Sequence, residues 1–429
     1  MSRSLLDKNA NLTITDHINL KYREFALYVL QSRGIPNFYD SLTPVQRLII
    51  EYAPSNFNKT LSLVGEVISS GNYHHGDMSL SSAVSRLAKN FGCSHTLLNG
   101  DGFFGSPVNP QPSAARYTSV KIDPFVKEIV QKHWDLNERN SEGFYDSINL
   151  ESPIGLMTHV LGIAVGYRSN ILPRKMEDVN SYLEGENKLL KPYFKNFKGK
   201  ISKFPDLENS WLIESELEID ETHQTIRIGD LSPLLRYDST MERILTKIEE
   251  IGVENQIFNR STDTVDILIK IKGGREYFKQ AKDVVKSITQ HIVREGIVFI
   301  KDGKVIEYES IHDYLNDFRI QKETVILKRL IKDNENNSRE LNYMEAKLKF
   351  LEWMMGKKRK NDEILEWLSQ WETPISSRLS KIELVKLSPE EMASTKKAIE
   401  EYKKIIAETS KKIKKQESNL GSIKKKALS

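Results

Sequence analysis

The sequence predicts an α+β protein of several domains: a helix-turn-helix region, then a mixed α/β region, then a long antiparallel coiled coil. Apolar residues recur at helical spacing before residue 70, apolar and acidic residues alternate over 212–220 and 264–271, and apolar residues recur every three or four positions from 320 onward. At roughly 150 residues per domain, a chain of 429 residues is long enough for about two to four such units.

Composition excludes several classes of protein. A hydrophobic share of 39% with 28% charged residues is typical of a folded chain rather than a disordered one. The single cysteine, Cys93, allows neither an intramolecular disulfide nor a cysteine-based zinc site. No apolar run approaches the roughly 20 residues of a membrane span, and the first residues lack a signal-peptide core, so we expect a cytoplasmic protein without a membrane partner.

Net charge alone indicates no partner. A formal charge of +4 over the whole chain is too small to identify a nucleic-acid-binding protein. Residues 401–429 carry nine lysines and three glutamates, and such lysine-rich ends are commonly solubilising.

The N-terminal region is predicted to be a short arm followed by a helical domain. Residues 1–20 are polar and without period, and we expect them to form a loose arm. Apolar spacing predicts two helices between 22 and 52, separated by the turn-rich segment 33–44, and a further helix over 59–69. A strand-like segment at 117–122 follows, and this succession favours a winged helix, a variant of the helix-turn-helix.

The middle region, residues 151–304, is predicted to be mixed α/β. The alternating segments 212–220 and 264–271 are expected to be half-buried strands, with a helix over 240–251 between them. Gly273 and Gly274 are expected to end the second strand.

The last region, residues 305–429, is predicted to be an antiparallel coiled coil. Apolar residues occupy 320, 327, 330, 341, 344, 348, 351 and 355, with Asn334 and Asn337 in the same seam. A second helix should begin at 388–391, where Ser388 is a candidate N-cap and Pro389 suits the first helical position. The segment at about 357–387 lies between the two helices and is expected to form a small knob.

Chemistry-bearing motifs are concentrated before residue 180. The chain has no GxxxxGK[ST] loop, no HExxH and no Asp-x-Asp pair, so we expect metal and nucleotide to be supplied by another chain. The motifs present, in order, are RGIP (33–36), PVQR (44–47), YHHGD (73–77), LLNGDGFFGS (97–106), AARYT (114–118) and GIAVGYRSNILP (162–173).

In this order and spacing, the six motifs resemble those of the breakage-reunion subunit of type II DNA topoisomerases, the family that includes the gyrase A protein together with the medium subunit of the phage topoisomerase. The resemblance spans most of the chain. It implies a winged-helix DNA-cleavage (DNA-gate) domain over 21–150, a tower or shoulder domain over 151–304, and a coiled coil over 305–429 whose knob is an exit-gate dimer contact.

The resemblance also implies a catalytic group. The tyrosine of AARYT, Tyr117, would attack a DNA phosphate and retain the 5′ end as a phosphotyrosyl ester. A free tyrosine is only about 0.1% phenolate at neutral pH, so an attacking tyrosine needs a base or cation nearby, and the phosphorane needs positive charge. Arg116 and Arg33 match the family arginines that line the phosphate, and His75 matches the active-site histidine.

DNA-holding residues follow from the same resemblance. Ile163 matches an isoleucine that wedges between base pairs and bends the gate duplex. Arg47 and Lys59 match positions that hold the backbone without reading sequence, and His74 is a further candidate. Taken singly, each of these residues would more simply be an ordinary structural side chain, so it is the joint pattern that supports the assignment.

The chain departs from the family pattern at three positions. Thr43 stands where many relatives have lysine, Gln46 where gyrases have histidine, and Met78 where quinolone-sensitive gyrases have serine or threonine. The sequence also stops soon after the second coiled-coil helix and has no QRRGGKG-like box. Relaxation or decatenation is therefore expected rather than supercoiling.

The resemblance predicts an ATP-dependent isomerase acting in DNA replication, in host cytoplasm if phage-encoded. Two copies would form the gate in double-stranded DNA, and a large subunit with TOPRIM and ATPase domains would bind Mg²⁺ and ATP. A tyrosine recombinase is disfavoured because its nucleophile lies near the C-terminus. A non-catalytic DNA-binding scaffold with a winged helix and a coiled coil is the remaining alternative, and it predicts that Tyr117→Phe keeps all function.

Overall fold

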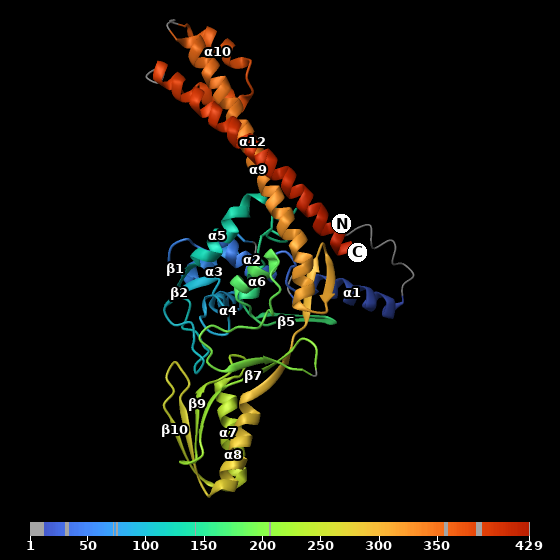
Figure 1. Cartoon of the computed structure of the whole chain (residues 1–429), viewed down its shortest axis with the longest axis vertical. Helices are drawn as coiled ribbons and strands as arrows, with labels where there is room; N and C mark the ends of the chain where they lie inside the picture. Colours follow the sequence, from blue (N-terminus) through green and yellow to red (C-terminus); the bar gives the residue numbers. More distant parts are fainter. Residues whose placement is uncertain are drawn as a thin grey trace. The chain divides into compact units, whose positions relative to one another are not determined.

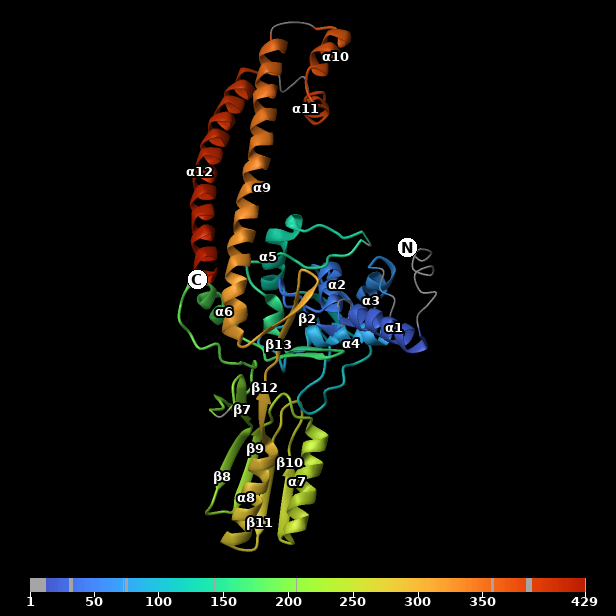
Figure 2. The same cartoon turned by 90° about the vertical axis from the view of Figure 1, so that its right-hand side faces the viewer.

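The computed structural model describes residues 13–30, 34–71, 73, 76–141, 143–205, 207–355, 359–382 and 388–428 (Figures 1 and 2). The chain divides into two compact units, Met1–Arg319 and Ile320–Ser429. The mixed α+β character predicted from the sequence is confirmed. No helix in the described part of the chain is long and apolar enough to cross a membrane.

The helices of the first unit are α1 (Ile14–Val29), α2 (Pro44–Tyr52), α3 (Thr60–Ser69), α4 (Asp77–Ala88), α5 (Pro124–His133), α6 (Met176–Glu184), α7 (Tyr237–Ile251) and α8 (Arg275–Thr289), with 3₁₀ turns at Trp134–Leu136 and Ile154–Met157. Its strands are β1 (Asn58–Lys59), β2 (Leu98–Asp101), β3 (Ser119–Ile122), β4 (Val160–Ala164), β5 (Tyr167–Ile171), β6 (Lys200–Lys203), β7 (Ser210–Glu214), β8 (Glu216–Asp220), β9 (Thr225–Asp230), β10 (Glu254–Asn259), β11 (Ile267–Lys272), β12 (Gln290–Arg294), β13 (Ile297–Lys301) and β14 (Lys304–Tyr308). Helix α9 (Ile311–Met354) begins in this unit and continues into the second.

Helix α1 begins inside the segment predicted to be a loose arm. Thr13 and Asp16 cap it reciprocally: the Asp16 amide donates to Thr13 Oγ1 at 3.2 Å, and the Thr13 amide donates to Asp16 Oδ2 at 3.3 Å. Ile14 and Ile18 then continue a helical spacing. The expectation of an unstructured arm over 1–20 is therefore wrong from Ile14 onward, and residues 1–12 lie outside the described part.

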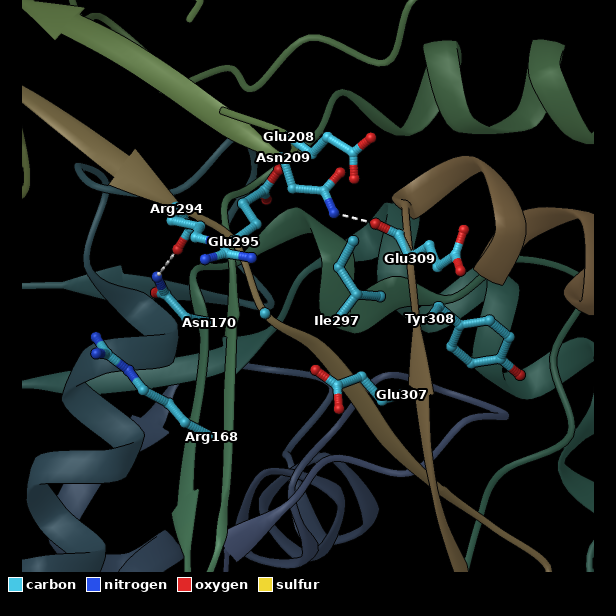
Figure 3. Close-up of a pocket in the computed structure, with 11 residues that line it drawn as sticks. Arg168, Asn170, Glu208, Asn209, Arg294, Glu295, Ile297, Glu307, Tyr308 and Glu309 are labelled. Atoms are coloured by element: carbon cyan, nitrogen blue, oxygen red, sulfur yellow. Dashed lines mark hydrogen bonds between the residues drawn. The ribbon is translucent and has the colours of Figure 1, made fainter. Parts of the chain in front are cut away.

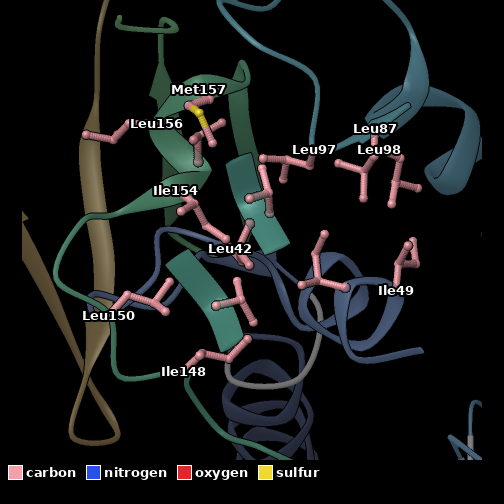
Figure 4. Close-up of a cluster of buried hydrophobic side chains, with 14 of the residues drawn as sticks. Leu42, Ile49, Leu87, Leu97, Leu98, Ile148, Leu150, Ile154, Leu156 and Met157 are labelled. Atoms are coloured by element: carbon pink, nitrogen blue, oxygen red, sulfur yellow. The ribbon is translucent and has the colours of Figure 1, made fainter. Parts of the chain in front are cut away.

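A three-stranded antiparallel sheet, in the order β1-β3-β2, packs with the helices α2, α3, α4 and α5 of the N-terminal region. The buried side chains form one cluster, part of which is drawn in Figure 4. This cluster runs from Phe38 to Phe318 along the sequence, so one core crosses both predicted domain boundaries, 150/151 and 304/305.

A second sheet, in the order β10-β11-β9-β8, has helices α7 and α8 on one face (Figure 2). Its core is separate and joins Ile226, Ile228, Ile244, Ile267 and Ile269 with their neighbours. The predicted strand over 212–220 is split at Ser215 into β7 and β8, which belong to different sheets. The predicted strand over 264–271 is β11, and Gly273 and Gly274 follow its end as expected.

Three smaller sheets complete the first unit. Strands β12, β7 and β6 form one sheet, and β4-β5 and β13-β14 form hairpins.

Arg174 and Glu295 make a buried ion pair, with Nη2–Oε2 at 2.6 Å and Nη1–Oε1 at 2.8 Å. Glu295 also accepts from Trp211 Nε1 and the Leu172 amide, so the carboxylate is satisfied by several donors.

The second unit consists of the remainder of α9, α10 (Asn361–Ser369), α11 (Thr373–Leu379) and α12 (Pro389–Leu428). The pairs Lys396–Glu352 at 3.7 Å and Lys403–Glu345 at 3.3 Å, together with the pair Lys347–Glu391, show that α9 and α12 run antiparallel. The first helix of the coiled coil begins at Ile311 rather than at 305, because 304–308 forms strand β14.

The N-cap and the knob lie where the sequence predicted them. The Glu391 amide donates to Ser388 Oγ at 3.1 Å at the start of α12. Helices α10 and α11 fill much of the segment predicted as a knob and pack against the end of α9 through Phe350, Met354, Trp367 and neighbouring apolar residues. Residues 356–358 and 383–387 lie outside the described residues.

Candidate active site at Tyr117

Tyr117 lies in a turn just before the central strand of the N-terminal sheet. Its amide donates to the Ala114 carbonyl at 2.8 Å, and β3 begins two residues later at Ser119. The side chain is 67% exposed. The strand predicted to start at Tyr117 therefore starts after it, and the phenol projects from a turn rather than from a half-buried strand.

Helix α3 braces this turn from one side. Its first amides, those of Thr60 and Leu61, donate to the carbonyls of Thr118 and Ala115 at 3.0 and 3.2 Å. The Thr118 and Thr60 hydroxyls are hydrogen-bonded at 2.8 Å, and both residues are buried. Because the first amides of a helix have no partner within it, the turn satisfies them and is held in place in return.

The glycine-rich motif 97–106 braces the turn from the other side. Strand β2 pairs with β3, and the chain that follows β2 lies close to Thr118. A β-carbon at Gly102, whose φ is +102°, would lie 3.3 Å from Thr118 Cγ2. The Ser113 amide donates to the Phe103 carbonyl at 2.9 Å. A β-carbon at Gly105 would lie 2.7 Å from the Pro110 carbonyl oxygen, so glycine is required for this approach. Two motifs that are separate in the sequence thus build one loop.

Three basic residues lie on the Tyr117 turn or on the strands next to it. The Arg116 guanidinium carbon lies 4.8 Å from the centroid of the Tyr117 ring, and both side chains are exposed. Lys59 pairs in register with Ser119, two residues after Tyr117, and is exposed. Lys121 Nζ lies 4.6 Å from the Phe57 ring centroid. Of these cations, Arg116 is the one whose contact with the Tyr117 ring is established.

Arg47 does not lie on this surface. Its side chain is buried, with Nε donating to Asp40 Oδ2 at 2.6 Å and Nη2 donating to the Leu42 carbonyl at 3.1 Å. Asp40 also accepts from the Leu42 amide at 2.8 Å. The guanidinium thus holds the loop before α2 from inside, and this placement leaves it unable to contact a DNA backbone as the sequence predicted.

The side chain of Gln46 also has a hydrogen-bond partner within the chain. Its Oε1 accepts from the Thr43 amide at 2.9 Å at the start of α2. The Gln46 side chain thus caps the start of α2.

Ile163 lies on the hairpin β4-β5 and is 68% exposed, paired in register with the exposed Arg168. Its neighbour Gly162 contacts Gly34 of the RGIP motif: a β-carbon at Gly162 would lie 2.2 Å from the Gly34 carbonyl oxygen, and one at Gly34 would lie 2.7 Å from the Ile163 carbonyl oxygen. The first and last motifs of the sequence are thus packed backbone to backbone, as only glycines permit.

Arg33, His74 and His75 lie outside the described residues, so their predicted roles stay predictions. The residues that follow Arg33 and His75 are described. Gly34 makes the contact above, and Gly76 is the N-cap of α4.

A cavity lies elsewhere in the first unit (Figure 3). It has a volume of about 750 Å³ and is lined from β5, β12, β13 and β14 by Arg168, Arg294, Glu307 and their neighbours. No residue of the Tyr117 turn lines it, and Glu295 in its wall is already paired with Arg174. The cavity is therefore not part of the tyrosine site.

No group of three or more His, Cys, Asp or Glu side chains suited to a metal ion occurs in the described part of the chain. The residues around Tyr117 supply cations and hydroxyls rather than a set of oxygen ligands, so they do not fit a magnesium ion by themselves.

Comparison with known proteins gives one family model and relatives whose names agree with it. Residues 33–428 match the family model that describes the A subunit of DNA gyrase/topoisomerase IV. The chain is 29% identical over 333 residues to the DNA gyrase A subunit of Streptomyces coelicolor, covering 72% of this chain and 34% of that protein. It is 28% identical over 350 residues to the DNA topoisomerase medium subunit of Enterobacteria phage T4, covering 73% and 75%. The match thus spans about a third of the Streptomyces protein but three quarters of the phage subunit.

Proposed function

Because the chain belongs to the family of DNA gyrase and topoisomerase IV A subunits, we propose that it is the DNA cleavage-religation subunit of a type IIA DNA topoisomerase, with Tyr117 as the nucleophile. The observation that carries the proposal is the exposed phenol of Tyr117 on a turn held from both sides and flanked by Arg116.

In the proposed reaction the Tyr117 oxygen attacks a backbone phosphorus. The Oη–P bond forms, the P–O3′ bond breaks, the phenolic proton passes to a base for which His75 is the candidate, and the 3′ oxygen takes up a proton from solvent and leaves as a hydroxyl. Religation reverses these steps and restores the phosphodiester, so it requires no external energy source.

This chain contributes two things to the proposed reaction: cations that stabilise the phosphate charge, and hydrogen bonds that hold Tyr117 in position. Arg116, and Arg33 by the family pattern, stabilise the negative charge that grows on the phosphorane. Lys59 holds the backbone nearby. The hydrogen bonds of Thr60 and Thr118 fix the turn, so that little reorganisation is needed when the phosphate arrives.

The hairpin that carries Ile163 is proposed to bend the cleaved duplex. An exposed isoleucine at the end of a rigid hairpin can unstack one base step, at a cost of about a few kcal/mol that contact with the bent backbone offsets. The close contact of Gly162 and Gly34 holds the hairpin against the RGIP segment.

Two copies of the chain would form the gate, with the N-terminal sheet and helices acting as a winged helix and the knob of α10 and α11 as the exit-gate dimer contact. A large subunit with TOPRIM and ATPase domains would bind Mg²⁺, which supports phosphoryl transfer, and ATP, which drives strand passage. The product would be relaxed or decatenated DNA.

Trapping the covalent complex tests this proposal. The chain, its large subunit, Mg²⁺ and linear duplex are mixed and stopped with detergent, and DNA that remains bound to protein is measured. We expect an adduct with the wild type and with the control Tyr277→Phe, a surface-exposed tyrosine on α8, and none with Tyr117→Phe. An adduct that survives Tyr117→Phe would refute the assignment, and unchanged relaxation by that variant would favour the non-catalytic scaffold.

A further inference from the structure

The C-terminal half of helix α12 carries a concentration of positive charge that the tyrosine site does not use. Residues 409–428 hold seven lysines and one glutamate, whereas the preceding residues of the same helix, 389–408, hold four lysines and five glutamates. Solubility alone does not explain why the positive charge is concentrated in one half of the same helix.

Four of these lysines lie on the side of α12 that faces away from α9. Lys411, Lys414, Lys415 and Lys425 follow the spacing i, i+3, i+4 and i+14, which places them on one face, and all four are exposed. The opposite face is the seam, where Leu420 is buried and Gln416 donates to the Glu323 carbonyl at 3.3 Å.

These charges are not neutralised within the described part of the chain. Among the described residues, none of the four lysines forms an ion pair, whereas Lys396 and Lys403 in the first half of the helix pair with Glu352 and Glu345 of α9. The free face spans about 21 Å from Lys411 to Lys425, because a helix rises about 1.5 Å per residue. That length corresponds to about six base pairs of duplex DNA.

We propose that this lysine face, defined by Lys411, Lys414, Lys415 and Lys425, is a second, sequence-independent binding surface for the phosphates of duplex DNA. The proposal rests on the proposed function in one respect: a strand-passing enzyme handles a second duplex besides the one it cleaves. Lysine suits such a surface because it is a point charge that binds phosphate without fixing its orientation or reading bases.

Four exposed lysines on one face of a helix, which form no ion pair among the described residues, are complementary in charge to the phosphates along a duplex. Ser418 and Ser422 occupy the same face between the lysines, so no acidic side chain interrupts it. Glu417, the one acidic residue of the segment, lies outside this set of positions.

The test compares matched variants of the full chain in complex with its large subunit. The first variant changes the four lysines of the face to glutamine, and the control changes Lys396, Lys397, Lys403 and Lys404 to glutamine in the first half of the same helix. A third variant changes the four lysines of the face to arginine, which keeps the charge.

The first measurement is the salt dependence of binding to a random-sequence duplex in excess. We expect the slope of log affinity against log salt to fall in magnitude by about 3.6 for the glutamine variant of the face, since each of its four lost phosphate contacts removes about 0.9. The control and arginine variants should keep the wild-type slope. An unchanged slope for the glutamine variant of the face would overturn the proposal and leave the lysines a solubilising role.

The second measurement locates the duplex. Ser418→Cys, carrying an iron chelate that cleaves nearby DNA, should cut a bound duplex without sequence preference, and Ala393→Cys in the first half of the helix should not. The natural Cys93 is buried, so it does not compete for the label. Equal cutting from both positions, or none from 418, would contradict the proposal.

Covalent trapping at Tyr117 separates this proposal from the proposed function. If the wild type forms the adduct and the glutamine variant of the face forms it equally but relaxes supercoiled DNA more slowly, the lysine face acts apart from the chemistry. If the wild type forms no adduct, the proposed function fails, while the binding measurements still decide whether the face contacts DNA.

Discussion

Gly162→Ala tests whether the hairpin carrying Ile163 is fixed by its contact with the RGIP segment. The added β-carbon would lie 2.2 Å from the Gly34 carbonyl oxygen and 3.2 Å from Pro36 Cδ. Ordinary contacts of a β-carbon begin at 3.4 Å, so backbone must move by about 1 Å, because no flexible side chain can yield in its place. Overpacking of this kind costs about 1–3 kcal/mol.

The same displacement should reach the DNA. A shift of about 1 Å in a positioning element can reduce a rate about 10²-fold, so we expect Gly162→Ala to lower both the bend of the bound duplex and the yield of covalent adduct. Bending is measured by energy transfer between dyes at the duplex ends, and stability by denaturant unfolding.

The matched control is Gly65→Ala. This glycine lies within α3, and its β-carbon would have no heavy atom within 4 Å, so the change should stabilise the helix by about 0.5–1 kcal/mol. If Gly162→Ala unfolds at the wild-type denaturant concentration and bends DNA normally, the contact with Gly34 does not hold the hairpin.

Three further predictions concern the Tyr117 turn, the wedge and acid stability. Thr118→Val should cost about 1–3 kcal/mol in denaturant unfolding by leaving the buried Thr60 hydroxyl unpartnered, and adding Thr60→Val should recover much of it; additive losses would show that the two hydroxyls are not coupled. Ile163→Ala should reduce duplex bending while the chain stays as stable as the wild type, and an unchanged bend would remove the wedge role. Burial raises the pKa of Glu151, but hydrogen bonds, led by that from His133, outweigh this effect and hold the pKa at about 2. The ionised Glu151 therefore stabilises the fold above about pH 4.5, and this stabilisation is lost as pH falls toward 2. Calorimetry of Glu151→Gln should show a free energy of unfolding that depends less on pH in that window.

Local signals in the sequence predicted the elements that depend on near neighbours. The start of α12 was predictable because a cap is set by residues within one turn, here Ser388 and Glu391. The same logic applies to α1, where Thr13, Ile14, Asp16 and Ile18 contain both a cap and a helical spacing, so the signal for this helix was present although the segment was interpreted as an arm.

Long-range contacts were not predictable in this way. The alternation over 212–220 correctly indicates strand, but nothing local indicates that Ser215 divides it between two sheets. The interpretation of Arg47 failed for the same reason. Its partner Asp40 is close in sequence, but Asp40 also accepts from the Ile148 amide, 108 residues away, and the ion pair of Arg47 and Asp40 is buried.

The sequence also did not predict the hydrogen bonds that hold the Tyr117 turn in place. Thr60 and Thr118 are 58 residues apart, and only Thr118 belongs to one of the six motifs. The six motifs identified the tyrosine, but only the fold brings the start of α3 and the glycine-rich segment after β2 together around it.

The most direct test of the central claim is the chemical identity of the bond to DNA. The trapped complex is digested with nuclease and protease, and the peptide that begins at Tyr117 and ends at Lys121 is analysed by mass spectrometry. We predict a nucleotide joined through its 5′ phosphate to the Tyr117 oxygen. A nucleotide joined through a 3′ phosphate, or attached to any other residue, would contradict the account.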